Sequence, residues 1–366
     1  MSKKIVVSGY HGYNNTGDEA VLEAFIDFLR SRMPDVEVVV LSADPKITAE
    51  TYKVKSVGRF DLLAVFGELR RCDLLVSGGG SLLQDVTGTR SIPYYLGIIG
   101  MARMLKVKVS IFAQGIGPVS RSFFKRMICK AFRRVDSISV RDRGSLQFLR
   151  SIGVDRSDVH VVSDPAFCLN PVEVPDRLAD KVDENTIVFA VREWNGLIRE
   201  ETVAACIDRM CERIGTKAVL MAFQSDADLK FAEGIAEMSR SAVEVVSCDL
   251  DPKLVEGIIS HAGLVVGMRL HSLILAASCS VPCAGISYDP KVDELFKGLG
   301  LDEVVSLDDM AAEDDGGTEM LCDLVERSWS ERKALHDRLE DRVPDMKNLA
   351  FKACEIAVSP IEGKQM

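Results

Sequence analysis

Three consecutive residues, Arg269, Leu270 and His271, have the side chains and the position to act on an anionic substrate. They follow a short apolar run that ends at Gly267, and a helical pattern begins near His271. Backbone N–H groups at a helix start attract anions, an arginine adds fixed positive charge, and a histidine exchanges protons near neutral pH. This corner suits a phosphorylated or carboxylated substrate that needs a proton moved. The alternative is structural, with an arginine that caps a neighbouring element and a histidine that is simply packed.

A glycine-rich loop between residues 9 and 19 is the first of several polar loops that follow predicted strands. Its glycines do not match the dinucleotide-binding spacing G-x-G-x-x-G. They stand beside Asn15, Asp18 and Glu19, where the backbone can approach a polar ligand closely. The alternative is a strained turn in which Asp18 caps the helix predicted over residues 20–30.

Two more glycine-bearing stretches follow strands in the first half of the chain. The strand predicted over residues 73–77 runs into three glycines, and we expect a helix to start there with a backbone-lined pocket around Gly79. Gln114 begins a similar loop, and Arg141 lies where a strand becomes a helix. Because parallel strands end at one edge of a sheet, these residues are predicted to share a site. For the triple glycine the alternative is close packing of a helix on a strand.

The second half of the chain repeats this pattern. Arg192 and Gln224 follow the strands predicted over residues 186–191 and 218–222. Lys291 lies in a later loop, where it can neutralise phosphate or deliver a proton, unless it is only a solvated lysine in a turn. Two Asp-x-Asp pairs, at 226–228 and 249–251, each precede a helix and are interpreted as helix caps. We therefore predict no metal site.

The alternation of strands and helices predicts an α/β protein with two Rossmann-like, doubly wound domains that face a cleft. The first domain is expected over residues 1–172 and the second over residues 186–344, with residues 173–185 as the linker. A final helix at about residues 345–360 is expected to pack back on the first domain. Pro344 is predicted to break the helix that precedes it. This GT-B-like architecture is the one that many glycosyltransferases use.

Composition excludes several classes of function. The 366 residues carry a formal net charge of −10, which argues against general affinity for nucleic acid. Ten dispersed cysteines indicate reduced thiols, and no apolar run is long enough to span a bilayer, so we expect a cytoplasmic protein. The basic helix predicted over residues 122–134 is either a surface helix with its apolar stripe in the core or a patch that rests on an anionic membrane.

Six motifs occur in one order along the chain, and together they resemble the polysaccharide pyruvyl transferase family. The resemblance covers about residues 4–300 and is closest to the CsaB type, which pyruvylates cell-wall polymers that anchor surface-layer proteins. The motifs are G-Y-x-G-x-x-N-x-G-D-E (Gly9 to Glu19), G-G-G-S-L-L-Q-D (Gly78 to Asp85), A-Q-G-I-G-P (Ala113 to Pro118), S-V-R-D (Ser139 to Asp142), R-L-H-S-L (Arg269 to Leu273) and S-Y-D-P-K-V (Ser287 to Val292).

The resemblance implies a donor, phosphoenolpyruvate, whose pyruvyl group forms a cyclic ketal with two sugar hydroxyls. For the CsaB type it implies the 4- and 6-hydroxyls of an N-acetylmannosamine residue in a lipid-diphosphate-linked disaccharide, with no cofactor. Carried over by motif, Arg141, Arg269, Leu270 and His271 contact phosphoenolpyruvate, and His271 and Lys291 are catalytic candidates.

The chemistry of ketal formation requires an acid that protonates the methylene carbon and a base directed at the hydroxyls. It also requires cations on the leaving phosphate and on the carboxylate. We assign the proton transfer to His271 and the cationic role to Lys291 with the two arginines. Asp18 and Glu19 are the candidates for holding or deprotonating the sugar, and Asn15, Gly79, Gln114, Arg192 and Gln224 for lining the rest of the site.

Two other functions fit the same fold. A sugar-nucleotide glycosyltransferase often holds the ribose with a glutamate on the helix after the phosphate-binding corner, but the helix at residues 272–278 has no acid. A non-catalytic module that binds sugar or lipid is the other alternative, and it predicts binding without phosphate release.

Overall fold

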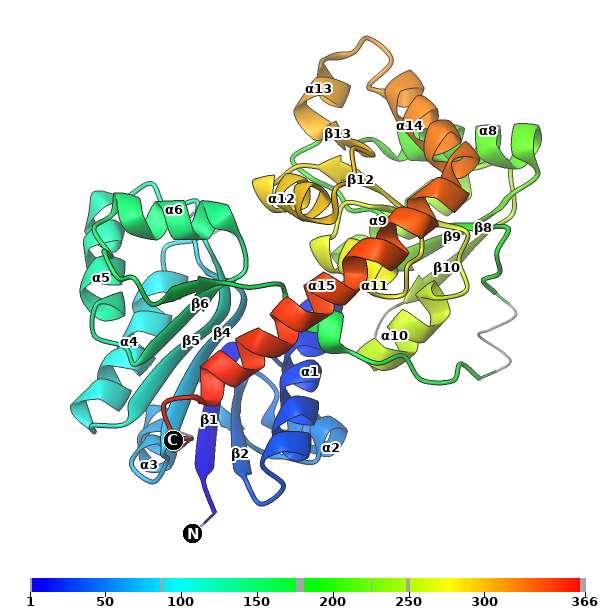
Figure 1. Ribbon diagram of the computed structural model, residues 1–366. Helices are drawn as coiled ribbons and strands as arrows, with labels where there is room; N and C mark the ends of the chain where they lie inside the picture. The colour runs from blue at the N-terminus through cyan, green and yellow to red at the C-terminus, as the bar shows by residue number, and fades with distance from the viewer. Residues whose placement is uncertain (1, 86–87, 176–180, 225, 248–250, 363–366) are drawn as a thin grey trace. The chain divides into compact units, whose positions relative to one another are not determined.

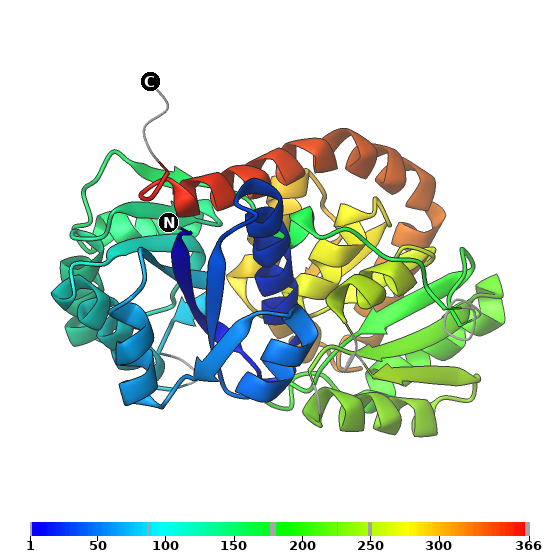
Figure 2. The same ribbon diagram turned by 90° about the horizontal axis from the view of Figure 1, so that it is seen from below.

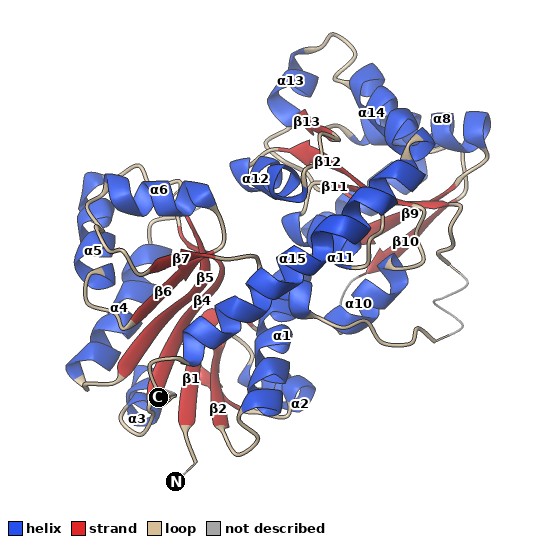
Figure 3. Cartoon of the chain, in the orientation of Figure 1, coloured by secondary structure: helices blue, strands red, loops and turns tan. Residues whose placement is uncertain are grey.

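The computed structural model describes residues 2–85, 88–175, 181–224, 226–247 and 251–362, which form two compact α/β units. Unit 1 comprises Met1–Tyr13, Asp18–Leu169 and Met346–Met366. Unit 2 comprises Asn14–Gly17 and Asn170–Asp345, so the chain passes from unit 1 to unit 2 just before the expected linker at residues 173–185. Each unit is built on one sheet of parallel strands, drawn in red in Figure 3. The predicted α/β class is confirmed.

The sheet of unit 1 has seven strands in the order β3-β2-β1-β4-β5-β6-β7. The central strands are rich in Val, Ile and Leu, as expected of parallel strands that are buried on both faces. The strand order reverses between β1 and β4, which is where doubly wound sheets bind ligands. The strands are β1 (Lys4–His11), β2 (Glu37–Ser42), β3 (Lys55–Gly58), β4 (Leu74–Leu83), β5 (Lys108–Ile116), β6 (Ser137–Val140) and β7 (Val159–Val161).

Alternate residues of β5 show how helices cover both faces of this sheet. Ile111 belongs to one hydrophobic core with α3, α4, α5 and α6. Its neighbour Phe112 points the other way and packs on Phe25 of α1, with ring centroids 4.6 Å apart. The helices of unit 1 are α1 (Thr16–Arg32), α2 (Pro45–Tyr52), α3 (Leu62–Leu69), α4 (Ser91–Met104), α5 (Ser122–Phe132) and α6 (Arg143–Ser151), with a 3-10 turn at Pro165–Cys168.

The sheet of unit 2 has six strands in the order β10-β9-β8-β11-β12-β13, and its order reverses between β8 and β11. The strands are β8 (Thr186–Ala190), β9 (Lys217–Ala222), β10 (Val243–Ser247), β11 (Leu264–Gly267), β12 (Cys283–Ser287) and β13 (Val304–Ser306). The helices are α8 (Glu200–Ile214), α9 (Ala227–Met238), α10 (Pro252–Ile259), α11 (Leu270–Ser278), α12 (Pro290–Leu299), α13 (Leu307–Ala312) and α14 (Thr318–Ser330) (Figure 1).

The last helix, α15 (Arg332–Val358), continues through Pro344, so the predicted break at this proline is wrong. Figure 2 shows α15 as one helix, coloured orange to red. A proline removes one N–H and so frees the carbonyl four residues earlier, here that of Glu340. Glu340 is exposed, and water can therefore satisfy that carbonyl. Buried residues on the helix, including Leu339 and Val343, hold the rest in place.

The stretch of three glycines is the second departure from expectation. β4 does not end at Ser77 but continues through the glycines to Leu83, and the next helix starts only at Ser91. All three glycines have positive φ, and a Cβ on Gly78 would lie 2.1 Å from the carbonyl oxygen of Phe112 in β5. Gly78 therefore allows two strands to approach closely. The predicted helix start around Gly79 is wrong.

Within the described residues, no helix is long and apolar enough to cross a membrane. The nine cysteines in that part of the chain are all free thiols. In the basic helix α5, Phe124, Ile128 and Phe132 are buried. The apolar stripe of α5 therefore faces the core of unit 1, as one of the two interpretations of this helix predicts.

Candidate functional site

Four neighbouring strands of unit 2 bring five of the predicted site residues to one edge of the sheet. Strands β9, β8, β11 and β12 lie side by side, and all of them run in the same direction. Their carboxyl ends therefore share an edge, and the loops that leave it carry the predicted residues. These are Gln224 after β9, Arg192 after β8, Arg269 and His271 after β11, and Lys291 after β12.

The corner between β11 and α11 is built as the sequence predicts. β11 ends at Gly267, and a Cβ there would lie 2.6 Å from Oγ of Ser272, so the glycine makes room for the first turn of α11. Leu270 and His271 are the first two residues of α11. The described residues provide no side-chain cap for this helix, whose N-cap position is Arg269. The N–H groups of its first turn, with the positive end of the helix dipole, are thus the kind of group that binds an anion.

The guanidinium of Arg269 is neutralised by the protein. Its Nε and Nη2 donate to the carboxylate of Asp228 at 2.9 and 2.6 Å, and Nη2 also donates to Oε1 of Gln224 at 2.9 Å. The Asp228 side chain is only 2% exposed and also accepts from the backbone N–H of Gln224. Such a bidentate, buried ion pair fixes the position of both side chains. Asp228 is therefore the counter-ion of Arg269, and in this arrangement Arg269 positions the loops.

A second segment of the chain lies against this corner, and unit 2 includes it as Asn14–Gly17. Asn15 forms a β-bridge with Gln224, and Thr16 donates from its backbone N–H and its hydroxyl to the carbonyl of Phe223 at 3.2 and 3.1 Å. A Cβ on Gly17 would lie 2.0 Å from Nδ1 of His271. Asn15 and Gln224 are thus brought together beside the histidine, and only glycine fits at position 17.

Arg192 and Lys291 supply the other cations of this edge. The Arg192 guanidinium lies 5.1 Å from the ring centre of Trp194 and 6.0 Å from that of Tyr288, and these rings pack on each other. Among the described residues, no carboxylate lies within 4 Å of Arg192. Lys291 donates through Nζ to the Asp289 carboxylate at 2.9 Å, and Asp289 also caps α12. Arg192 is therefore more available to an anion than Arg269.

In unit 1, Arg141 is as firmly held as Arg269. It donates to Asp164 through Nη1 at 2.9 Å and to Oγ of Ser81 through Nη2 at 2.8 Å, and its side chain is 6% exposed. A Cβ on Gly115 would lie 2.8 Å from Nε of Arg141, so the glycine makes room for the guanidinium. The contacts of Arg141 join the ends of β4, β5 and β6.

Asp18 and Glu19 open the first turn of α1 but face different neighbours. A Cβ on Gly80 would lie 2.4 Å from Oδ1 of Asp18, so Asp18 lies against the glycine stretch within β4. Glu19 accepts from the N–H of Gly12 at 2.7 Å and from the Tyr52 hydroxyl at 2.8 Å. Burial raises the pKa of Glu19, although both hydrogen bonds act in the opposite direction. Both oxygens of Glu19 thus hold the loop, whereas Asp18 faces Gly80 of β4.

Gln114 lies within β5 and not in a loop, opposite Gly80 of β4. It is 1% exposed, and neither atom of its amide group has a hydrogen-bond partner among the described residues. Gly79 is also part of a strand, with its missing side chain replaced by Val21 of α1. Gly79 and Gln114 are therefore both buried within strands of the unit 1 sheet.

Sequence reasoning missed the partners that hold the charged residues. Asp228 and Asp164 neutralise Arg269 and Arg141, and Tyr52 binds Glu19. A signal existed for Asp164, because it follows the valine-rich run at residues 159–162. The Asp-x-Asp spacing predicts a helix cap, whereas α9 begins at Ala227 and the described structure shows no side-chain cap at its N-cap position, Asp226. Of the second pair, Asp251 caps α10 as predicted, and Asp249 lies outside the described residues.

Among the residues that the structure describes, no three His, Cys, Asp or Glu side chains are grouped to hold a metal ion.

Comparisons with known proteins agree with the motifs. The protein named Amylovoran biosynthesis protein AmsJ, from Erwinia amylovora, is 24% identical over 371 residues, covering 83% of this chain and 88% of that protein. The S. aureus MnaA–UDP co-structure has a TM-score of 0.66 at 12% identity and covers 99% of this chain and 98% of its own. UDP-GlcNAc 2-epimerase from Neisseria meningitidis has a TM-score of 0.64 at 9% identity, covering 97% of this chain and 100% of its own.

The two solved structures show a shared fold and confirm the predicted GT-B-like class. Residues 15–290 match the family model described as polysaccharide pyruvyl transferase. This match contains Asn15, Arg141, Arg192, the corner at Arg269–His271 and the cap of α12 at Asp289. Because it extends over most of the chain, the chain belongs to the polysaccharide pyruvyl transferase family.

Proposed function

We propose that this protein moves the pyruvyl group of phosphoenolpyruvate onto two hydroxyls of an amino sugar and releases phosphate. The acceptor that we infer is an N-acetylmannosamine residue in a lipid-diphosphate-linked cell-wall precursor, ketalised at its 4- and 6-hydroxyls. The observation that carries the proposal is the corner of unit 2, where His271 lies in the first turn of α11 and the described residues provide no side-chain cap. Family membership supports pyruvyl transfer to a polysaccharide, and the corner supports an anionic donor.

The donor has a carboxylate and a phosphate, so its site needs at least two positive groups. We assign these to the first turn of α11, Arg192 and Lys291. Arg269 is assigned a positioning role because Asp228 already neutralises its guanidinium. This assignment changes one part of the sequence-based hypothesis, in which Arg269 and Arg141 held the donor directly.

The reaction that we propose begins when His271, as the imidazolium, transfers a proton to the methylene carbon of phosphoenolpyruvate. The double-bond electrons form the new C–H bond, and the adjacent carbon becomes an oxocarbenium-like centre. One sugar hydroxyl adds to this carbon and loses its proton to a base. The C–O bond to phosphate breaks, the second hydroxyl adds and loses its proton, and the ring closes. One phosphoenolpyruvate and one diol thus give one ketal and one phosphate.

For the acceptor we propose the carboxyl edge of the sheet in unit 1, with Asp18 as the group that accepts a hydroxyl proton or hydrogen bond. Asp18 is 9% exposed and lies against Gly80 of β4. Glu19 is excluded from this role because Gly12 and Tyr52 occupy its two oxygens. Gln114 offers an amide without partners in the described structure, which is a group suited to a sugar hydroxyl or an acetamido group.

The test is phosphate release from phosphoenolpyruvate, with and without a lipid-diphosphate-linked disaccharide that contains N-acetylmannosamine. The product mass is determined in the same reaction. We expect release that depends on the acceptor, together with the mass gain of a pyruvyl ketal. His271→Gln should lower kcat by about 100-fold or more while the unfolding temperature stays the same. The matched control is His261→Gln, an exposed histidine after α10.

Other outcomes would change the assignment. Phosphate release with a neutral-sugar acceptor alone would keep the reaction and replace the amino sugar. Turnover of a sugar nucleotide without any use of phosphoenolpyruvate would favour the glycosyltransferase. Binding of the acceptor without release of phosphate would favour the non-catalytic module. A normal kcat for His271→Gln would remove the acid–base role of this histidine.

A further inference from the structure

A group of cations on α4, on α5 and directly after α5 forms one surface of unit 1 that the proposed reaction does not use. We call it the basic face, and it consists of Arg103, Arg126, Lys130, Arg133 and Arg134, all exposed. Arg103 lies 3.3 Å from the carboxylate of Asp136, and Arg133 donates to the carbonyl of Gly153. Within the described part of the chain, Arg126, Lys130 and Arg134 have no carboxylate within 4 Å. The basic face therefore carries uncompensated positive charge on a chain whose net charge is −10.

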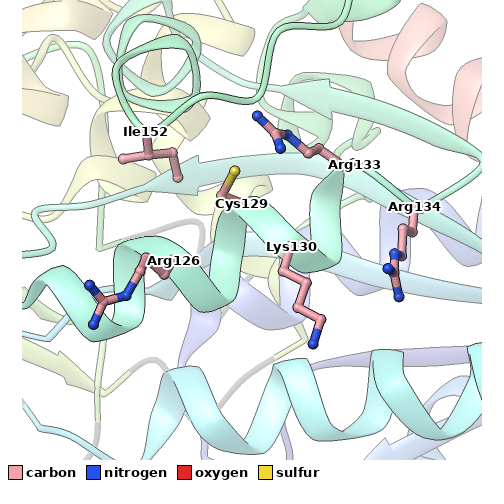
Figure 4. A pocket seen from close by; sticks show the side chains of 6 residues that line it. All are labelled: Arg126, Cys129, Lys130, Arg133, Arg134 and Ile152. Carbon is pink, nitrogen blue, oxygen red and sulfur yellow. The ribbon is translucent and has the colours of Figure 1, made fainter.

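Two hollows lie on either side of Lys130 and Arg134, which line both of them. The larger, of about 590 Å³, lies between α4 and α5, and its apolar lining includes Leu96, Ile99 and Met127. The smaller, of about 280 Å³, lies between α5 and Ile152. Figure 4 shows Lys130 extending from α5 toward α4, with Arg126 and Arg134 to either side. Each hollow thus combines an apolar wall with cations.

Large apolar side chains stand exposed beside these cations. Phe123, in the first turn of α5, is 60% exposed, and Met104, at the end of α4, is 70% exposed. The stripe of α5 that faces the core is made of Phe124, Ile128 and Phe132, so Phe123 lies outside it. Cations next to exposed apolar groups are typical of surfaces that rest at the boundary between lipid headgroups and acyl chains.

We propose that the basic face docks on the surface of a bilayer that contains anionic phospholipid. The cations meet the headgroups, and Phe123 and Met104 enter the upper acyl region. Charge complementarity selects this occupant: a second copy of the chain, related by a two-fold axis, would place like charges against each other. A free phosphate ion would not use the apolar walls of the hollows. The proposal concerns unit 1 and does not depend on which donor or acceptor the enzyme uses.

The experiment is co-sedimentation of the full-length protein with vesicles of phosphatidylcholine alone or of phosphatidylcholine mixed with phosphatidylglycerol. We expect binding only to the mixed vesicles, strong at about 0.1 M salt and nearly abolished at about 1 M. Lys130→Glu with Arg134→Glu should weaken the partition coefficient by about 30-fold or more, because each basic residue contributes several-fold. Phe123→Ser should lower the partition coefficient by a smaller factor, and this factor should depend less on the salt concentration.

The matched control is Lys333→Glu with Lys352→Glu, which makes the same change in net charge on two exposed residues of α15. It should retain at least half of the wild-type binding. Equal losses in the two double variants would show that net charge alone is responsible and would overturn the proposal. Binding to pure phosphatidylcholine, or a dimer in solution that only the Lys130 and Arg134 variant disrupts, would also overturn it. Unchanged unfolding temperatures for all variants exclude misfolding as the cause.

Discussion

Arg269 and Arg192 leave the same edge of the same sheet, but their guanidinium groups meet different partners. Arg269 is held by Asp228 and Gln224, whereas Arg192 packs on Trp194 and Tyr288. Both are arginines, and each stands two residues after the end of its strand, β8 or β11. The difference lies in a carboxylate that comes from α9, more than forty residues earlier than Arg269. An arginine in a motif can therefore position other groups without touching a substrate itself.

This difference predicts opposite effects of two equivalent substitutions. Arg269→Met leaves Asp228 buried and without its cation, so the free energy of unfolding should fall by about 3 kcal/mol. Asp228→Asn in the same chain should recover part of that loss, because the uncompensated charge is then removed. Arg192→Met should leave the unfolding free energy nearly unchanged and raise KM for phosphoenolpyruvate by about tenfold or more. Urea unfolding and steady-state kinetics measure the two quantities.

The opposite pattern would reverse the two assignments. If Arg269→Met were stable and raised KM, while Arg192→Met left KM unchanged, Arg269 would hold the donor and Asp228 would be displaced when substrate binds.

At the scale of elements, much of the architecture could be predicted because parallel strands are apolar along their whole length. The strand over 186–190 is one such case. The helix that follows Arg269 was predicted in the same way, from the helical pattern that begins near His271. The structure of the three-glycine stretch could not be predicted, because the same three glycines can open a helix or let two strands approach. Only the backbone contact between Gly78 and Phe112 decides between them. Ion pairs such as Arg141 with Asp164 depend on which strands are neighbours, and sequence spacing does not contain that information.

The end of strand β1 provides a pH prediction. His11 is 2% exposed, and neither ring nitrogen has a hydrogen-bond partner among the described residues. Burial, with a smaller effect of Arg59, lowers the pKa of His11 to about 3. The unfolded chain binds a proton below about pH 6.5, and the folded chain does not until about pH 3. Stability is therefore lost as the pH falls through this range, by about 1.4 kcal/mol for each pH unit.

His11→Gln removes the titrating group, so its unfolding free energy should change less between pH 7 and about pH 5 than that of the wild type. The control is His160→Gln, which makes the same substitution at an exposed histidine on β7, away from the end of β1. Chemical unfolding at several pH values measures both. Parallel curves for His11→Gln and the wild type would show that His11 takes up its proton over the same pH range in the folded and unfolded chains.

At the scale of the whole molecule, α15 is shared by the two units. Its first part contacts unit 2, where His336 bonds to the carbonyl of Ser280 at 2.7 Å and Arg338 pairs with Glu303 at 3.2 Å. Its last part contributes to the core of unit 1, where Ala353 and Cys354 are fully buried. Unit 1 is thus completed by a segment that follows all of unit 2 in the sequence.

A charged side chain introduced into the last part of α15 should destabilise unit 1 and leave the stability of unit 2 unchanged. Ala353→Asp places an unpaired carboxylate in the core of unit 1, which should cost about 3 kcal/mol or more. Amide hydrogen exchange should then accelerate in β1 and β4, while β8 and β11 keep their protection, because each sheet has its own core. Lys352→Asp, on the exposed side of the same turn, should change neither the free energy of unfolding nor the rate of amide exchange in either sheet. Equal acceleration in both sheets would mean that the two units unfold as one cooperative body, and the last turns of α15 would then stabilise the donor corner as well as the sheet that they cover.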